Sequence, residues 1–94
     1  MKIHKITEKH IGKILKCHVS WERRFSQYEY ILSTDSYGYK YRLWNLQSVQ
    51  PQSWEYGMYS HNGSYYWEPV SDLELVVLGI PFPEGYVRES DRTK

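Results

Sequence analysis

The stretch WEYGMYSHNGSYYWEPV, residues 54–70, contains the clearest local signal for the fold. At its centre lies Asn62-Gly63, a pair that tolerates the positive φ angles required at both central positions of a type I′ turn. The segments on either side are rich in Tyr and Trp, which are common in β-strands. The stretch therefore predicts two antiparallel strands joined by a tight turn.

Counting outward from this turn assigns a register and two faces to the predicted hairpin. Tyr59 is paired with Tyr66 and Met58 with Trp67, and successive side chains point to opposite faces. The face with Met58, Tyr65 and Trp67 is predicted to join the core. The opposite face is predicted to meet solvent or a partner and carries Glu55, Tyr59, His61, Tyr66 and Glu68.

A second hairpin is predicted over residues 28–44. Residues 35–38, Asp-Ser-Tyr-Gly, are typical of a four-residue turn, and they separate YEYILST from YKYRLW. Side chains alternate in the second of these strands, which predicts one aromatic face and one mostly basic face. The aromatic face carries Tyr39, Tyr41 and Leu43, and the other carries Lys40, Arg42 and Trp44.

Two further segments complete the C-terminal half. The apolar, β-branched run at residues 73–78 predicts a last strand that ends at Gly79 and Pro81. Residues 81–94 contain two prolines and a charged run, so they predict an extended and then disordered tail. A single small domain over residues 1–80 follows from the length of 94 residues.

Residues 7–18 fit two patterns. Ile11, Ile14, Leu15 and His18 lie at helical spacing, whereas the alternation of Leu15, Cys17, Val19 and Trp21 is that of a strand. Gly12 would cost a helix about 1 kcal/mol relative to Ala, so a strand is favoured. The alternative is an α+β fold with a helix at about residues 7–18.

The resulting order of elements resembles that of Src-homology-three-like small barrels, including the Tudor and KOW types. Residues 65–76, YYWEPVSDLELV, are similar to the end of such a barrel, where a strand leads into one tight helical turn, here Val70–Leu73, and then a final strand. Ile11–Leu15 resembles the opening strand. The resemblance covers about residues 8–78 and implies an all-β barrel of five or six strands. In place of the acidic loop of the families that bind Pro-rich peptides, the chain has Trp21–Phe25, so such a ligand is not expected.

Composition and charge narrow the class of protein. Residues 1–24 carry seven Lys or Arg and two Glu, whereas the rest carry five basic and nine acidic residues, so a basic face and an acidic face are predicted. There is no apolar run of about 18 residues, and MKIHKI at the start is not typical of a signal peptide. With Cys17 as its single cysteine, the chain is predicted to be cytoplasmic, without a membrane partner.

Residues that could carry chemistry are scattered. His4, His10, Cys17, His18 and His61 are metal-ligand types, but they form no Cys-x-x-Cys or His-x-x-x-His pair. The chain also has no nucleophile elbow, no phosphate-binding glycine loop and no indicated carboxylate pair. We therefore expect no enzyme, no metal site and no cofactor.

Protein binding is the favoured function. The chain has 16 aromatic residues, more than a small core is expected to absorb, and exposed Tyr, Trp and Arg are enriched at interfaces. The partner is expected to be a host or cognate protein, because small Tyr- and Trp-rich chains resemble the phage and mobile-element proteins that inhibit or modulate host proteins. Self-pairing into a homodimer is an alternative. The predicted contacts are Trp21, Arg23, Arg24 and Phe25 in the first long loop, and Tyr59, His61 and Tyr66 on the outer hairpin face.

Single-stranded nucleic acid is the alternative partner. Positive side chains interleaved with flat rings neutralise a phosphate backbone and stack on bases. The residues of this kind are Arg23, Arg24, Lys40, Arg42 and Trp44. A net charge of only +1 argues against this function, because nucleic-acid-binding domains usually show a clear basic excess.

Overall fold

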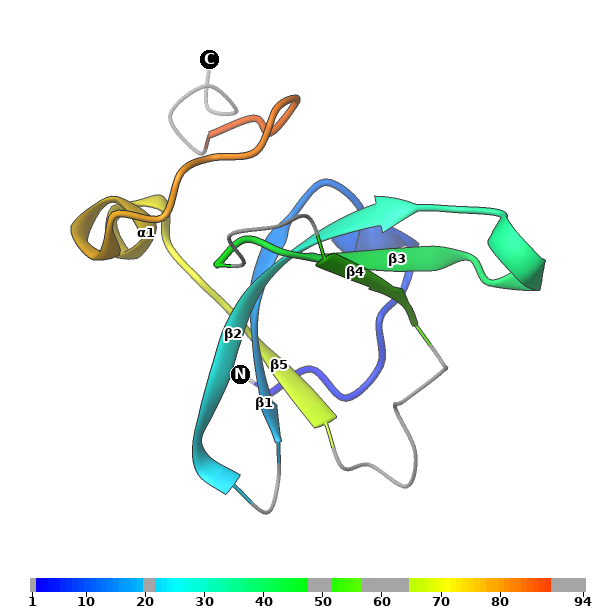
Figure 1. The fold of residues 1–94 in the computed structure, drawn as a ribbon, viewed down its shortest axis with the longest axis horizontal. Coiled ribbons are helices and arrows are strands. Elements are labelled where there is room, and N and C mark those ends of the chain that lie inside the picture. Colours follow the sequence, from blue (N-terminus) through cyan, green and yellow to red (C-terminus); the bar gives the residue numbers. More distant parts are fainter. Residues whose placement is uncertain (1, 20–21, 48–51, 57–64, 89–94) are drawn as a thin grey trace.

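The computed structural model describes residues 2–19, 22–47, 52–56 and 65–88 (Figure 1). The strands are β1 (Ile14–Val19), β2 (Glu22–Ser33), β3 (Tyr41–Asn45), β4 (Gln52–Glu55) and β5 (Tyr65–Pro69). The helical elements are two short 3-10 turns, η1 (Glu8–His10) and η2 (Ser36–Gly38), and one α-helix, α1 (Asp72–Leu78). The prediction of a small β domain with five or six strands is confirmed, with five strands and one short α-helix.

The five strands form one antiparallel sheet in the order β4-β3-β2-β1-β5. The long strand β2 joins its two halves, because residues 26–30 pair with β1 and residues 29–33 pair with β3. Figure 1 shows β2 bending between these two partners, so that the sheet curls. The strand interpretation of residues 7–18 holds for β1, which follows η1 and begins at Ile14.

The predicted hairpin of residues 28–44 is confirmed. Ser33 pairs with Tyr41, and Ile31 lies opposite Leu43. The side chains of Ile31 and Leu43 are fully buried. The connection contains η2, in which Tyr37 and Gly38 both have positive φ angles. The turn chemistry of residues 35–38 was therefore a sufficient signal for this hairpin.

Strand segments are present on both described flanks of the predicted hairpin of residues 54–70, as β4 and β5, but their predicted pairing with each other is wrong. Its described flanks do not pair with each other: Trp54 of β4 lies opposite Leu43, and Trp67 of β5 lies opposite Cys17, at the other edge of the sheet. The residues of a turn predict local backbone geometry, but they do not specify which distant strand pairs with the segment on either side of the turn. The face assignment depends only on alternation, so it is correct for Trp67, which is fully buried, and for Tyr65, which packs against it. The turn itself, with Met58, lies outside the described residues.

The predicted last strand at residues 73–78 is wrong, because this segment is the helix α1. The Ser71 side chain accepts a hydrogen bond from the Glu74 amide at 3.2 Å, which caps the N-terminus. At the other end Gly79 has φ of 73°, and its N–H bonds to carbonyls of the last turn. These end signals outweigh the strand preference of the β-branched residues between them. Among the described residues, no helix has the length and apolar character needed to cross a membrane.

The core lies on both faces of the sheet. The inner cluster occupies one face and consists of Ile6, Leu15, Cys17, Ile31, Leu43 and Trp67. The outer cluster occupies the other face and consists of Ile14, Tyr28, Tyr30, Leu75 and Ile80. Residues 81–88, part of the predicted tail, form no helix or strand, but the Phe82 and Tyr86 rings stack on each other at 5.5 Å and pack against the outer cluster.

Candidate functional site

The most exposed aliphatic side chains of the described residues gather on α1. Leu73, Val76 and Val77 are 71, 58 and 75% exposed, and their i, i+3, i+4 spacing places them on one face of the helix. We call these three residues the α1 stripe. Leu75 is the buried residue of the helix, and it points into the outer cluster. A contiguous apolar surface of this kind is typical of an interaction site.

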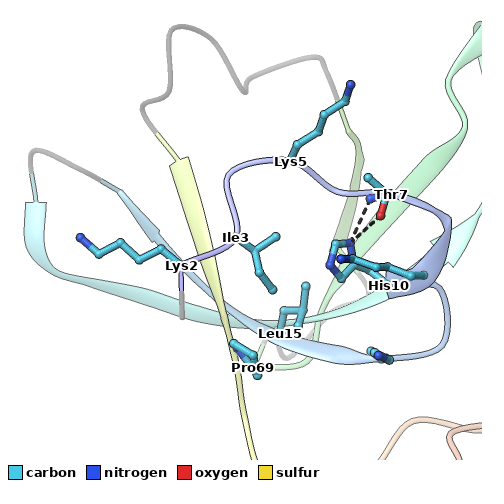
Figure 2. A pocket seen from close by; sticks show the side chains of 9 residues that line it. Lys2, Ile3, Lys5, Thr7, His10, Leu15 and Pro69 are labelled. Carbon is cyan, nitrogen blue, oxygen red and sulfur yellow. Dashed lines mark hydrogen bonds between the residues drawn. The ribbon is translucent and has the colours of Figure 1, made fainter.

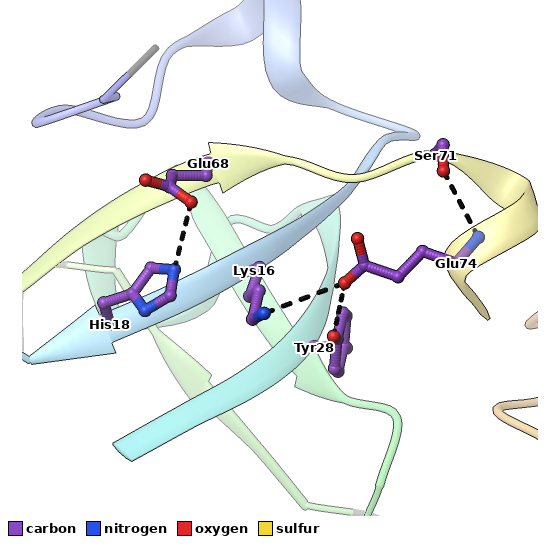
Figure 3. A network of polar contacts seen from close by, with 6 residues as sticks. All are labelled: Lys16, His18, Tyr28, Glu68, Ser71 and Glu74. Atoms are coloured by element: carbon purple, nitrogen blue, oxygen red, sulfur yellow. Dashed lines mark hydrogen bonds and ion pairs between the residues drawn. The ribbon is translucent and has the colours of Figure 1, made fainter. Parts of the chain in front are cut away.

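Polar contacts hold α1 with the stripe facing outward. Tyr28 of β2 donates a hydrogen bond to Glu74 Oε2 at 2.5 Å, and Lys16 Nζ of β1 lies 3.7 Å from the same oxygen (Figure 3). The Tyr86 hydroxyl donates to Asp72 at 2.6 Å. Burial, followed by the bond to Glu74, raises the pKa of the Tyr28 hydroxyl, so it remains protonated and able to donate. The helix is therefore fixed by its polar side and its buried Leu75.

Tyr66 is the predicted contact residue whose side chain is described, and it lies on the outer face of β5 as expected. The ring is half-buried because the His18 ring stacks on it at 4.9 Å and Lys2 Nζ lies 4.8 Å from its centroid. His18 Nε2 is also 3.4 Å from Glu68 Oε2 (Figure 3). Side chains of the same chain thus cover part of the surface that Tyr66 was predicted to offer to a partner.

The other predicted protein contacts are placed only in part. Trp21, Tyr59 and His61 lie outside the described residues. Arg23, Arg24 and Phe25 were expected in a long loop, but their backbone belongs to β2, and their side chains lie outside what the structure describes. The loop prediction is wrong because the ladder between β1 and β2 continues to the pair formed by Val19 and Glu22.

The alternative nucleic-acid residues Arg42 and Trp44 of β3, with Lys40 just before it, do not form one free basic and aromatic surface. Arg42 makes an ion pair with Glu55 at 2.7 Å, which neutralises its charge. Trp44 packs against the outer cluster, whereas Lys40 is exposed beside the turn. The alternation was predicted correctly, but Glu55 was assigned to a different hairpin, so its pairing with Arg42 was not expected.

Sequence reasoning missed the polar centre of the inner cluster, Glu29. This fully buried carboxylate accepts hydrogen bonds from the indole N–H of Trp67 at 2.8 Å, the indole N–H of Trp54 at 2.7 Å and the Gln27 amide at 2.6 Å. Burial raises the pKa of Glu29 even though these donors oppose the rise. The sequence could have predicted that Glu29 is buried, because it lies two residues before Ile31 in the same strand and alternation places both side chains on the core face.

The titratable groups of the inner cluster are enclosed. Burial, followed by the nearby Glu29 carboxylate, raises the pKa of the Cys17 thiol, so this cysteine stays protonated and is a weak nucleophile. Within the described ranges, no three His, Cys, Asp or Glu side chains gather as metal ligands would. Comparison of the chain with protein-family models, curated proteins and solved structures found no match.

Proposed function

We propose that this protein is a non-catalytic binding module that docks on a host or cognate protein in the cytoplasm. The observation that carries the proposal is the α1 stripe, in which three large apolar side chains are each more than half exposed on one rigidly held helix. Burying one such side chain fully is worth about 1.5–3 kcal/mol, so three of them can anchor an interface. The mechanism is steric: the bound module would block or modulate its partner, as an inhibitor does.

The geometry of the stripe favours a particular kind of partner surface. Residues at i, i+3 and i+4 of a helix fit an apolar groove. The rest of the chain after residue 24 carries nine acidic and five basic residues, so a groove with a basic rim would be complementary. The aromatic and arginine residues predicted from sequence, Trp21, Arg23, Arg24 and Phe25, remain a second proposed contact.

The curled five-stranded sheet also supports a proposal about architecture. We propose that it is a small barrel of the Src-homology-three-like kind in which the final strand is replaced by α1. The part of this chain that resembles such a barrel would then be the sheet from β1 to β5.

The test is a double variant of the stripe, Leu73→Gln with Val77→Gln. Both side chains are mostly exposed, so we expect the unfolding free energy to change by less than about 0.5 kcal/mol. Proteins captured by the immobilised parent would be identified, and the affinity of the purified partner measured for parent and variant. We expect the affinity to fall by about 100-fold, equivalent to about 2.7 kcal/mol.

The matched control is Tyr37→Gln, which removes an exposed ring at the η2 end of the molecule, opposite α1 in Figure 1. It should bind like the parent. Equal affinity of the stripe variant and the parent would contradict the proposal. Concentration-dependent self-association that the stripe variant abolishes would show that the partner is a second copy of this chain.

A further inference from the structure

A cavity of about 380 Å³ lies between the N-terminal segment and the sheet (Figure 2), and no residue of the α1 stripe lines it. The segment is fixed on both sides of it. Ile3 exchanges two backbone hydrogen bonds with Trp67 of β5, at 2.7 and 2.8 Å, and Gly12 donates to the Ile31 carbonyl at 2.8 Å. The cavity is therefore built by pairing with the sheet, and its volume lies within the range of small-molecule sites.

The lining of the cavity is strongly basic. Lys2, Lys5, Lys9 and Lys13 all contribute to it, and no Asp or Glu does. Within the described part of the chain, none of these four ammonium groups has a carboxylate within 4.0 Å. Although Lys2 Nζ also contacts the Tyr66 ring, the four positive charges raise the positive potential around the cavity, which favours an anion.

His10 adds a directed hydrogen-bond donor to this lining. Its side chain is only 5% exposed, and its Nδ1 accepts a hydrogen bond from the Thr7 amide at 2.9 Å (Figure 2). Burial, followed by Lys9 and Lys13, lowers the pKa of the ring, so it is neutral at physiological pH and its proton is on Nε2. No hydrogen bond to Nε2 exists within the described residues, so its N–H is free for a ligand.

We infer that this cavity binds the phosphate group of a small phosphorylated ligand. A phosphate monoester carries up to two negative charges and three acceptor oxygens, which match several ammonium groups and the Nε2–H of His10. The flexible lysine stems allow the ammonium groups to turn toward such an anion. Ile3, Leu15 and Pro69 line the apolar part of the cavity and would contact the organic part of the ligand. The inference is independent of the proposed docking through α1.

The experiment is a titration of the full chain followed by NMR. Pyrophosphate, adenosine monophosphate and phosphoserine serve as probes, and the readouts are the amide signals of His10 and Lys13 and the ring nitrogen signal of His10. We expect saturable shifts at these positions at up to millimolar probe. Tighter binding of adenosine monophosphate than of phosphoserine would identify a nucleotide as the source of the phosphate, and the reverse order would identify a phosphorylated amino acid.

Two single variants form a matched pair. Lys13 and Lys40 both lie outside the strands, and the backbone carbonyl of each accepts one hydrogen bond. The Ile31 amide of β2 donates to Lys13 at 3.0 Å, and the Thr34 amide, just after β2, donates to Lys40 at 2.9 Å. Lys13→Gln should weaken binding about tenfold, and Lys9→Gln combined with it should weaken binding further, because each removes a charge-assisted contact. Lys40→Gln should change the affinity less than about twofold, because its charge lies outside the cavity.

Three results would overturn the inference. The first is no saturable shift of His10 with any probe. The second is an equal loss of affinity in Lys13→Gln and Lys40→Gln, which would indicate attraction to overall charge rather than a site. The third is binding of a single-stranded oligonucleotide that depends on Lys40 and Arg42 as strongly as on Lys13, which would indicate a nucleic-acid surface. An unchanged Trp67 indole signal in each variant would show that the core is intact.

Discussion

Glu29 shows how a single residue can organise the interior of a small sheet. An aliphatic side chain at this position could be buried without a desolvation cost, but it would remove the acceptor that Glu29 provides for the indole N–H groups of Trp54 and Trp67. The carboxylate satisfies both and the Gln27 amide as well, at the cost of its own desolvation. It therefore orients Trp67 of the inner cluster and Trp54, which packs against that cluster, and an apolar residue could not do this.

The raised pKa of Glu29 predicts a particular pH dependence of stability. Between the ordinary carboxyl pKa and the raised one, the folded state holds a proton that the unfolded state has lost, so the unfolding free energy falls as the pH rises through this window. The loss is about 1.4 kcal/mol for each pH unit of the window. In Glu29→Gln this contribution disappears, so the difference between parent and variant isolates it.

Urea unfolding of parent and variant across this pH range measures the effect. His10 titrates in both proteins and has a lowered pKa, so its contribution has the opposite sign and cancels in the comparison. A variant whose unfolding free energy declines with rising pH as steeply as that of the parent would show that Glu29 is not the group responsible.

At the scale of elements, the segments that could be predicted are those whose signals are local. The turn residues 35–38 and the alternation in residues 39–44 were sufficient for the β2–β3 hairpin, and the alternation of Leu15, Cys17 and Val19 was sufficient for β1. The strand prediction for residues 73–78 was wrong because it considered the strand preference of these residues without the Ser71 and Gly79 helix caps. The α1 stripe was missed for the same reason, since a strand would have divided these residues between two faces.

The C-terminal cap of α1 provides a prediction at this scale. Gly79 has φ of 73°, a conformation that costs an L-residue about 1 kcal/mol, and no other atom lies within 4 Å of a Cβ built there. We expect Gly79→Ala to lower the unfolding free energy by about 1 kcal/mol through the backbone alone, and Gly79→Asn to lower it less. Leu78→Ala, at an exposed neighbouring position, is the control. Equal stability of Gly79→Ala and the parent would show that this helix end does not contribute to folding.

At the scale of the whole molecule, the sheet is covered on both faces, and part of the cover on the outer face comes from beyond the predicted domain boundary. Phe82 and Tyr86 pack on the outer cluster, and Arg88 lies 4.3 Å from the Phe82 ring centroid. Charge and proline content pointed to an extended tail, but they carry no information about two isolated rings. Long-range partners such as Cys17 and Trp67 were not predictable for a similar reason, because pairing across the sheet depends on the assembled core.

This covering predicts a difference between two shortened chains. A chain that ends after Ile80 lacks the Phe82 and Tyr86 rings, so we expect its unfolding free energy to fall by about 2–4 kcal/mol. A chain that ends after Arg88 retains both rings and should be close to the parent. Thermal and urea unfolding of the three proteins measures the effect. If the two shortened chains unfold together, the segment after Ile80 contributes nothing to the fold.

The order of strands also has a consequence for the chain as it is synthesised. Cys17 and Trp67 are fifty positions apart, yet they lie opposite each other between β1 and β5, and both core clusters use residues made after β3. A nascent chain that has reached Asn45 exposes the apolar faces of three strands to water, and Glu29 has not yet met its indole donors. We therefore expect folding to be completed only after β5 and α1 have left the ribosome, and the growing chain to expose apolar surface to chaperones during that interval.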